Sequence, residues 1–270
     1  GDVKDTLQAI LSLIETKEDD KFLNRQLKFY DVVKKNLSLY VNDPGKPNNI
    51  HPEYVASVIS ELAHKDAIFT VDTGMCCVWA ARYIAGTGER KMLGSFNHGS
   101  MANAMPQAIG AALACPDKQV IAFCGDGGLS MMMGDLMTIV QYNLPVKIVL
   151  FNNRSLNMVK LEMQVAGIPD VETDMLNPDF VKLAEAMGIC GIQINDPADV
   201  RPALEKAFQQ DGPALISIQT DPNALAMPPK LEFDQMKGFA FYMGKMMISG
   251  RVDEIFKIIK SNYKHITEMI

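Results

Sequence analysis

The sequence predicts an α/β protein whose core is a doubly wound parallel sheet flanked by helices. Short continuous apolar runs recur along the chain, and stretches of helical length separate them. Strands of this kind are buried on both faces, and the helices between them form the crossovers that parallel strands need. Several runs end in glycine, aspartate or asparagine, which is typical of ligand-binding loops at the carboxyl edge of such a sheet. The chain has 270 residues, 48% of them hydrophobic, and can bury a core of this size.

The chain begins with a segment that does not resemble an independent domain. Leu7, Ile10 and Leu11 recur at helical spacing, which predicts one or two charged amphipathic helices before residue 40. Residues 41–50 then hold two prolines, a glycine and three asparagines, a composition typical of a linker. We therefore predict a connecting segment over 1–50, a ligand-binding domain over 51–230 and a C-terminal tail over 231–270.

The elements of the predicted domain follow in order from its apolar pattern. The strands are expected at Ala67–Val71, Val120–Cys124, Val146–Phe151, Cys190–Ile194 and Ala214–Ile218. The helices are expected at Pro52–Ala63, Ala102–Ala114, Leu129–Gln141, Pro178–Met187 and Ala198–Gln209. The alternation of the two sets indicates one parallel sheet.

Composition excludes several classes of protein. A net charge of -6 and a pI near 5.3 argue against a nucleic-acid binder, which usually carries a basic stripe. Five cysteines without a CxxC pair do not form a disulfide framework, so we expect a reduced, cytoplasmic setting. No apolar stretch is long enough to span a membrane. We read His51, His64 and His265 as single surface histidines and assign no metal to them.

Three loops that follow predicted strands carry the candidate chemistry. They are Asp72–Gly74, Gly125–Gly128 and Asn152–Asn153, and we expect them at one edge of the sheet. Gly127 and Gly128 would let backbone N–H groups approach an anion, while Asp126 and Asn153 offer the hard oxygen ligands that suit Mg²⁺. Together they predict a metal-bridged diphosphate. The alternative interpretation, without a ligand site, is that these residues form an Asp-Gly turn and a polar strand end. Neither a GxxxxGK[ST] nor a GxGxxG motif occurs.

The spacing of these residues resembles a known signature. Gly125-Asp126-Gly127, then 24 residues, then Asn152-Asn153 is similar to the motif of thiamine-diphosphate enzymes. The stretches Leu93–Ala112 and Met236–Glu254 resemble the pyruvate oxidase branch of that family. The resemblance implies a three-domain parent protein, of which this chain looks like the C-terminal third with a connecting segment. It also implies thiamine diphosphate, Mg²⁺ and FAD as cofactors, with FAD mainly on a missing central domain.

The resemblance assigns roles to individual residues. It implies that Asp126, the Asn153 side chain and the Ser155 carbonyl bind Mg²⁺, and that Gly127 and Gly128 donate N–H groups to the diphosphate. Met101 matches the apolar residue that holds the cofactor bent, and we place Gly74 and Ser100 among the cofactor contacts. Glu162 is implied to face the pyruvate pocket, with a solvated helical carboxylate as the equal alternative.

The activity that this resemblance implies is oxidative decarboxylation of pyruvate. Electrons would pass to FAD and then to quinone, giving acetate, or to oxygen, giving acetyl phosphate. The alternatives are an acetolactate synthase-type carboligase and, from another class, a non-catalytic phospholigand-binding module. The implied partners are pyruvate, the missing N-terminal and FAD domains, and further copies in a homo-oligomer, a tetramer in the full-length form. The N-terminal domain would supply an essential glutamate.

The C-terminal tail has a pattern of its own. Apolar residues recur at steps of three and four, which predicts one amphipathic helix with lysines largely off its apolar stripe. The stripe comprises Val252, Ile255, Phe256, Ile259, Tyr263, Ile266 and Ile270. Packing on the domain is one interpretation. The other is peripheral binding to the inner face of the cell membrane, close to lipid and quinone.

Overall fold

The computed structural model describes residues 1–226 and 233–269 and contains two compact units. The first comprises Gly1–Asn36 and the second Leu37–Ile270. The predicted boundary between domain and tail at residue 230 lies outside the described residues. Among the helices of the described residues, none has both the length and the apolar character that crossing a bilayer requires.

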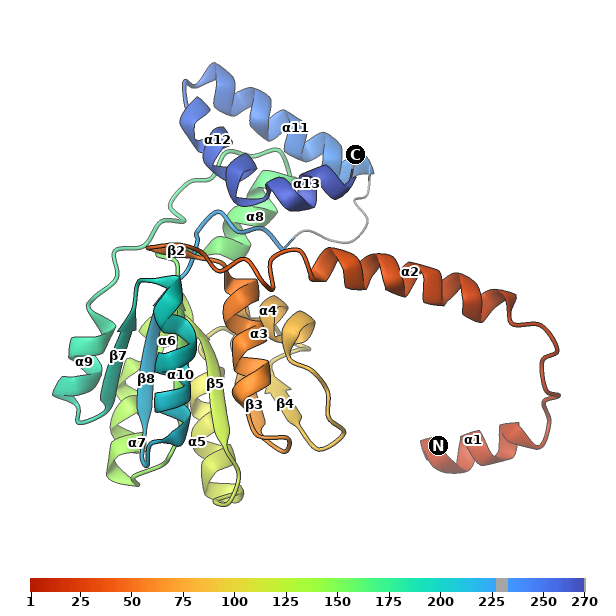
Figure 1. The fold of residues 1–270 in the computed structure, drawn as a ribbon, viewed down its shortest axis with the longest axis horizontal. Helices are drawn as coiled ribbons and strands as arrows, with labels where there is room; N and C mark the ends of the chain where they lie inside the picture. The colour runs from red at the N-terminus through yellow and green to blue at the C-terminus, as the bar shows by residue number, and fades with distance from the viewer. Residues whose placement is uncertain (227–232, 270) are drawn as a thin grey trace. The chain divides into compact units, whose positions relative to one another are not determined.

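The first unit consists of helices α1 (Val3–Leu11) and α2 (Lys21–Leu37), the second of which ends one residue beyond it (Figure 1). Asp2 caps α1, since its carboxylate accepts hydrogen bonds from the backbone N–H groups of Lys4 and Asp5. Neither helix has a buried residue. The helices therefore present their apolar side chains to solvent in this chain.

The second unit is built on a six-stranded parallel sheet in the order β4-β3-β5-β6-β8-β7 (Figure 1). The strands are β3 (Ile68–Val71), β4 (Lys91–Gly94), β5 (Val120–Gly125), β6 (Lys147–Asn152), β7 (Cys190–Ile194) and β8 (Ala214–Gln219). The five predicted strands are confirmed to within one residue at either end, because each is marked by a short, mostly apolar run. This confirms the predicted fold class.

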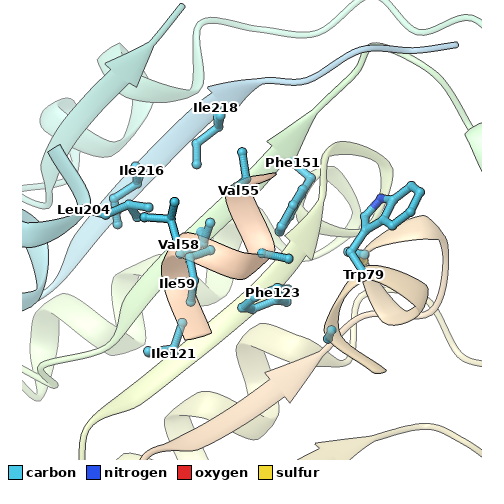
Figure 2. Close-up of a cluster of buried hydrophobic side chains, with 14 of the residues drawn as sticks. Val55, Val58, Ile59, Trp79, Ile121, Phe123, Phe151, Leu204, Ile216 and Ile218 are labelled. Carbon is cyan, nitrogen blue, oxygen red and sulfur yellow. The ribbon is translucent and has the colours of Figure 1, made fainter. Parts of the chain in front are cut away.

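Helices cover both faces of the sheet, which makes it doubly wound. On one face lie α3 (Pro52–Leu62), α4 (Met75–Tyr83) and α10 (Val200–Gln209); on the other lie α5 (Ala104–Ala114), α6 (Asp126–Met131), α7 (Leu136–Gln141) and α9 (Phe180–Ala186). Successive strand residues point to opposite faces, so Ile121 and Phe123 join the first cluster and Ala122 the second. Figure 2 shows Val55 and Ile59 of α3 lying among the strand side chains of the first cluster.

Several short elements were not predicted. β4 is one of the two edge strands of the sheet, and its Lys91 and Leu93 are exposed, so its pattern lacks the continuous apolar run of the inner strands. Residues 41–50, predicted as a linker, contain a small hairpin of β1 (Gly45–Lys46) and β2 (Asn49–Ile50). The 3-10 helices are η1 (Met133–Asp135) and η2 (Pro197–Asp199).

The C-terminal part packs on α8 (Asn157–Val165). It consists of α11 (Phe233–Ile248), α12 (Val252–Ser261) and α13 (Tyr263–Met269). A Cβ on Gly238 of α11 would lie 1.8 Å from the carbonyl oxygen of Val165, so this close helix crossing requires glycine. Tyr242 and Met246 form an apolar cluster there with buried side chains of α12.

The predicted single stripe of the tail is wrong in two respects. The helix breaks at Asn262, whose side chain bonds the N–H of Leu225 and the carbonyl oxygens of Asn223 and Ile258. Ile255 is buried against the apolar cluster, whereas other members of the stripe face solvent. Those are Val252, Phe256, Ile259 and Tyr263. Ile270 lies outside the described residues.

Two histidines predicted at the surface are buried instead. His51 and His265 flank the ring of Tyr40, with ring centroids 4.5 and 4.8 Å from it. The Nε2 atom of His265 lies 3.8 Å from a carboxylate oxygen of the buried Glu53. These long-range contacts between the two ends of the second unit leave no local sequence pattern.

Candidate functional site

A cleft lies at the carboxyl edge of the sheet, and we call it the edge cleft. Strands β3, β5 and β6 are adjacent and parallel, so the three predicted loops meet there, which confirms that expectation. The lining residues are Pro52, Thr73, Gly74, Met75, Cys76, Trp79, Met101, Gly125, Asp126, Gly127, Gly128, Phe151, Asn153, Ser155, Leu156, Asn157, Met158, Val159, Thr220, Asp221 and Ala224.

Asp126 is the most buried charge of the edge cleft, with 3% of its surface exposed. Its Oδ1 accepts a hydrogen bond from the N–H of Gly127 at 3.0 Å. Its Oδ2 accepts from the N–H of Arg154 at 2.6 Å and from the amide of Asn177 at 2.8 Å. Burial raises the pKa of Asp126, and these neutral donors offset only part of that effect. The hydrogen-bond donors that act most strongly on this carboxylate, from Asn177, Arg154, Gly127 and Asn153, are uncharged amide groups.

The helix after Asp126 begins earlier than predicted. Its expected start was Leu129, but α6 begins at Asp126 because β5 runs through Gly125 and turns directly into the helix. Gly127 and Gly128 therefore lie in its first turn and are buried. The predicted long helix to Gln141 is interrupted by η1.

The double asparagine ends β6 beside Asp126. The Oδ1 atom of Asn153 accepts a hydrogen bond from the N–H of Ser155 at 2.9 Å, and the Asn152 carbonyl side chain accepts from Asn177 at 3.0 Å. The Ser155 hydroxyl is buried and has no hydrogen-bond partner among the residues that the structure describes. A buried hydroxyl without a partner in a cleft leaves bonding capacity for a ligand.

Apolar side chains face the glycines across the edge cleft. A Cβ on Gly127 would lie 3.1 Å from Cε of Met101 and 2.9 Å from Cδ2 of Leu156. Trp79 lies on α4 and also lines the cleft. Gly74 takes a φ of 138°, in the region that favours glycine, at the turn from β3 into α4. The cleft thus has a polar floor and an apolar wall.

Two predicted site residues lie outside this lining. Ser100 is exposed, and its hydroxyl donates to the carbonyl oxygen of Met101 at 3.0 Å. Glu162 is exposed on α8 and lines a second cavity, between α8 and α11. The roles given to both residues stay predictions.

Sequence reasoning missed three residues of the site. Asn177 bonds both Asp126 and Asn152 from a distant loop, and no local motif marks it. Trp79 was not considered. Asp72 was included only as part of a loop, although the turn after a buried strand was the signal that could have singled it out.

This fold and cleft define a cofactor-binding domain. The family described as thiamine pyrophosphate enzyme, C-terminal TPP binding domain, matches residues 72–218, which include all three loops. The chain belongs to this family, and its domain is one that binds thiamine diphosphate.

Three curated proteins of similar sequence show which enzymes within the family this chain is similar to. The chain is 33% identical over 255 residues to "Putative thiamine pyrophosphate-containing protein YdaP" of Bacillus subtilis, covering 94% of this chain and 44% of that protein. It is 38% identical over 193 residues to a "Probable acetolactate synthase large subunit" of Methanococcus aeolicus, covering 70% and 32%. It is 32% identical over 256 residues to the acetolactate synthase large subunit of Lactococcus lactis, covering 89% and 42%. The chain therefore spans less than half the length of each.

These relatives correct the expected activity. The resemblance pointed to a flavin-dependent pyruvate oxidase, whereas the relatives are mostly named acetolactate synthases and no pyruvate oxidase is named among them. The physical reason is that the glycine- and asparagine-containing loops line the edge cleft, whereas Met236–Glu254 contributes no residue to that lining, and the same cofactor serves both reactions. Such loops cannot tell which reaction follows.

Proposed function

We propose that this chain is the cofactor-binding part of a thiamine-diphosphate enzyme of the acetolactate synthase type. Its substrate would be pyruvate, and its product acetolactate, formed by loss of carbon dioxide and addition of the remaining two-carbon unit to a second pyruvate. The names of the relatives support this reaction over oxidation. FAD, which the pyruvate oxidase resemblance placed mainly outside this chain, is assigned to no residue.

One observation carries the metal and diphosphate assignment. Asp126 is a buried carboxylate with a raised pKa, held by neutral amide donors in a cleft lined by glycine. A divalent cation would favour its charged form and would bridge it to a diphosphate. We propose Asp126, the Asn153 side chain and the Ser155 carbonyl as the protein ligands of Mg²⁺.

The oxygen ligands proposed here suit Mg²⁺, which is a hard cation, better than a softer metal ion such as Zn²⁺. The described residues contain no cluster of three His, Cys, Asp or Glu side chains that could hold a metal. The proposed set instead has one carboxylate and two neutral oxygens, which leaves the diphosphate to supply further charge.

The chain's own residues would bind and orient the cofactor. Gly127 and Gly128 would let the diphosphate approach the backbone, and Met101 with Leu156 would press on the rings from the opposite wall. Trp79 and Phe151 would keep water from that part of the cleft. Thiamine diphosphate, when bound, supplies the electron sink for decarboxylation of a 2-oxo acid.

Other parts of a longer protein would complete the site. We propose that they supply the glutamate implied by the family resemblance and that the whole protein is a homo-oligomer, a tetramer as the resemblance implies. The short share of each relative that this chain covers supports a longer parent.

The metal assignment is tested by cofactor binding. Trp79, the chain's single tryptophan, lines the edge cleft, so its fluorescence reports thiamine diphosphate titrated with and without Mg²⁺. We expect Asp126→Ala to lower the Mg²⁺-dependent affinity at least about a hundred-fold. The control Asp135→Ala changes an aspartate of η1, outside the cleft lining, and should bind normally. Unchanged binding by Asp126→Ala would remove the metal site, and Mg²⁺-independent binding would favour a phospholigand-binding module.

The reaction is tested on the longer protein that contains this chain. With pyruvate, thiamine diphosphate and Mg²⁺, we expect acetolactate to accumulate. Reduction of an electron-accepting dye without acetolactate would contradict the proposed reaction while leaving the cofactor site intact.

A further inference from the structure

Asp72 is a further buried carboxylate beside the edge cleft, in addition to Asp126 and Asp221 of its lining. It directly follows β3 and is 1% exposed. Its N–H donates to the carbonyl oxygen of Phe123 at 3.0 Å, and its carbonyl oxygen accepts from Sγ of Cys76 at 3.3 Å. The backbone of Asp72 is therefore fixed between β5 and α4. Asp72 does not line the cleft, so it is placed to act through neighbours.

The two carboxylate oxygens of Asp72 face two different elements. Oδ1 accepts a hydrogen bond at 2.9 Å from the N–H of Ala104, the first residue of α5. Oδ2 packs on the first turn of α6, where a Cβ on Gly128 would lie 2.3 Å from it. Only glycine permits this approach. One side chain thus contacts the starts of both α5 and α6.

The loop of residues 100–104, which leads into α5, carries Met101. Ala102, next along the loop, has a φ of 61°, which is strained for a residue with a side chain. The N–H nitrogen of Ala102 lies 3.2 Å from the position that a Gly128 Cβ would take, so the loop rests on α6 beside the carboxylate. Strain of this kind persists only where surrounding contacts enforce it.

We infer that Asp72 is a positioning residue that holds the 100–104 loop against α6 and so sets the distance between Met101 and Gly127. The inference deepens the proposed function and rests on it, because Met101 is there the residue that presses on the cofactor rings. Burial raises the pKa of Asp72 to about 6, although the N–H groups of Ala104, Asn103 and Gly125 oppose that rise. A buried carboxylate without a cation is costly to keep, which is consistent with selection for placement and not for stability.

Two probes separate positioning from a general effect on the fold. Thiamine diphosphate with Mg²⁺ needs both the glycines and Met101, whereas pyrophosphate with Mg²⁺ needs only the glycines and the metal ligands. We expect Asp72→Asn to lower thiamine diphosphate affinity about ten-fold, since a charge-assisted hydrogen bond is lost, and to change pyrophosphate affinity less than about two-fold. Met101→Ala should reproduce this split without touching Asp72.

The matched control is Asp66→Asn. Asp66 lies before the other end of the same strand, pairs with Lys118 and should leave both affinities unchanged. Equal losses for both probes, or none for either, would overturn the inference.

A second measurement does not depend on the cofactor. In the free protein, hydrogen exchange of the Ala102 and Ala104 amides should be faster in Asp72→Asn than in the wild type. Unchanged exchange would overturn the inference whatever the ligands do. A third outcome is faster exchange in Asp72→Asn together with a wild type that binds neither thiamine diphosphate nor pyrophosphate. That outcome would contradict the proposed function and leave Asp72 as the anchor of this loop.

Discussion

Three buried aspartates, Asp72, Asp126 and Asp170, lie in two regions of the molecule and are held there by different kinds of group. At the edge cleft, Asp126 and Asp72 are held by backbone N–H groups and a carboxamide, and burial raises the pKa of both. Between α8 and the C-terminal helices, Asp170 lies 3.4 Å from Lys160 and from Arg251. Burial opposes its charge too, but these cations outweigh it and hold the pKa of Asp170 below its usual value.

The presence or absence of a paired cationic side chain separates a structural carboxylate from one that needs a cation from outside the chain. Asp170 also accepts a hydrogen bond from the hydroxyl of Tyr242 at 3.3 Å, so α8, α11 and the turn before α12 converge on it. Its charge is neutralised within the chain. Among the described residues Asp126 has no such ion pair, and a metal ion would supply the positive charge. Raised carboxylate pKa values that coincide with a cleft thus mark the candidate site.

The largest expected effect tests the paired region. Asp170→Asn would remove the buried counter-charge that Lys160 and Arg251 share and leave them only the more exposed Asp174 and Glu254. We expect the free energy of unfolding to fall by about 3 to 5 kcal/mol, the usual cost of breaking a buried pair from one side. Denaturant titration measures it. Asp174→Asn is the control, because Asp174 also pairs with Lys160 but its side chain is 86% exposed. Its effect should stay under about 1 kcal/mol, and equal effects would refute the comparison.

The next effect tests the unpaired region through pH. The pKa of Asp72 is raised from 3.8 to about 6 in the folded chain, so folding binds its proton more tightly. Ionisation of Asp72 does not change the free energy of unfolding below pH 4, where the carboxyl is protonated in both states. It lowers that free energy as pH rises from 4 towards 6, and the loss remains above pH 6. Relative to the wild type, Asp72→Asn should therefore gain up to about 3 kcal/mol of unfolding free energy between pH 4 and pH 7. A difference that does not vary with pH would show that Asp72 keeps an ordinary pKa.

The parts of the fold and of the candidate site that could be predicted are those marked by a local sequence pattern. The inner strands were placed because burial on both faces demands continuous apolar residues, and Asp126 with Asn153 was found because each directly follows such a strand. Asn177 reaches Asp126 from 51 residues away, and its loop has no pattern of its own. The contact of Asp72 with Gly128 likewise depends on how two loops meet. The tail's two faces could not be separated, since periodicity does not say which side packs.

The smallest expected effect is that of an exposed apolar residue of α12, where the same contrast between a packed and an exposed group exists for apolar side chains. Ile255 is 4% exposed, whereas Phe256, the next residue, is 65% exposed. We expect Phe256→Ser to change the unfolding free energy by less than about 0.5 kcal/mol, and Ile255→Ala to cost about 2 to 5 kcal/mol. Thermal or denaturant unfolding of the two variants measures the difference.

The exposed face of α12 also has a predicted use. Phe256 and Ile259 lie beside Lys257 and Lys260, an arrangement typical of helices that bind the surface of anionic membranes. If the face serves this purpose, Phe256→Ser should weaken co-sedimentation with anionic vesicles at low salt while the fold is kept. Point substitution is a sharper test than removal of the tail, because deletion would also uncover the cluster around Tyr242. Equal vesicle binding by wild type and Phe256→Ser would exclude the membrane role, and the exposed face would then need a protein partner to explain it.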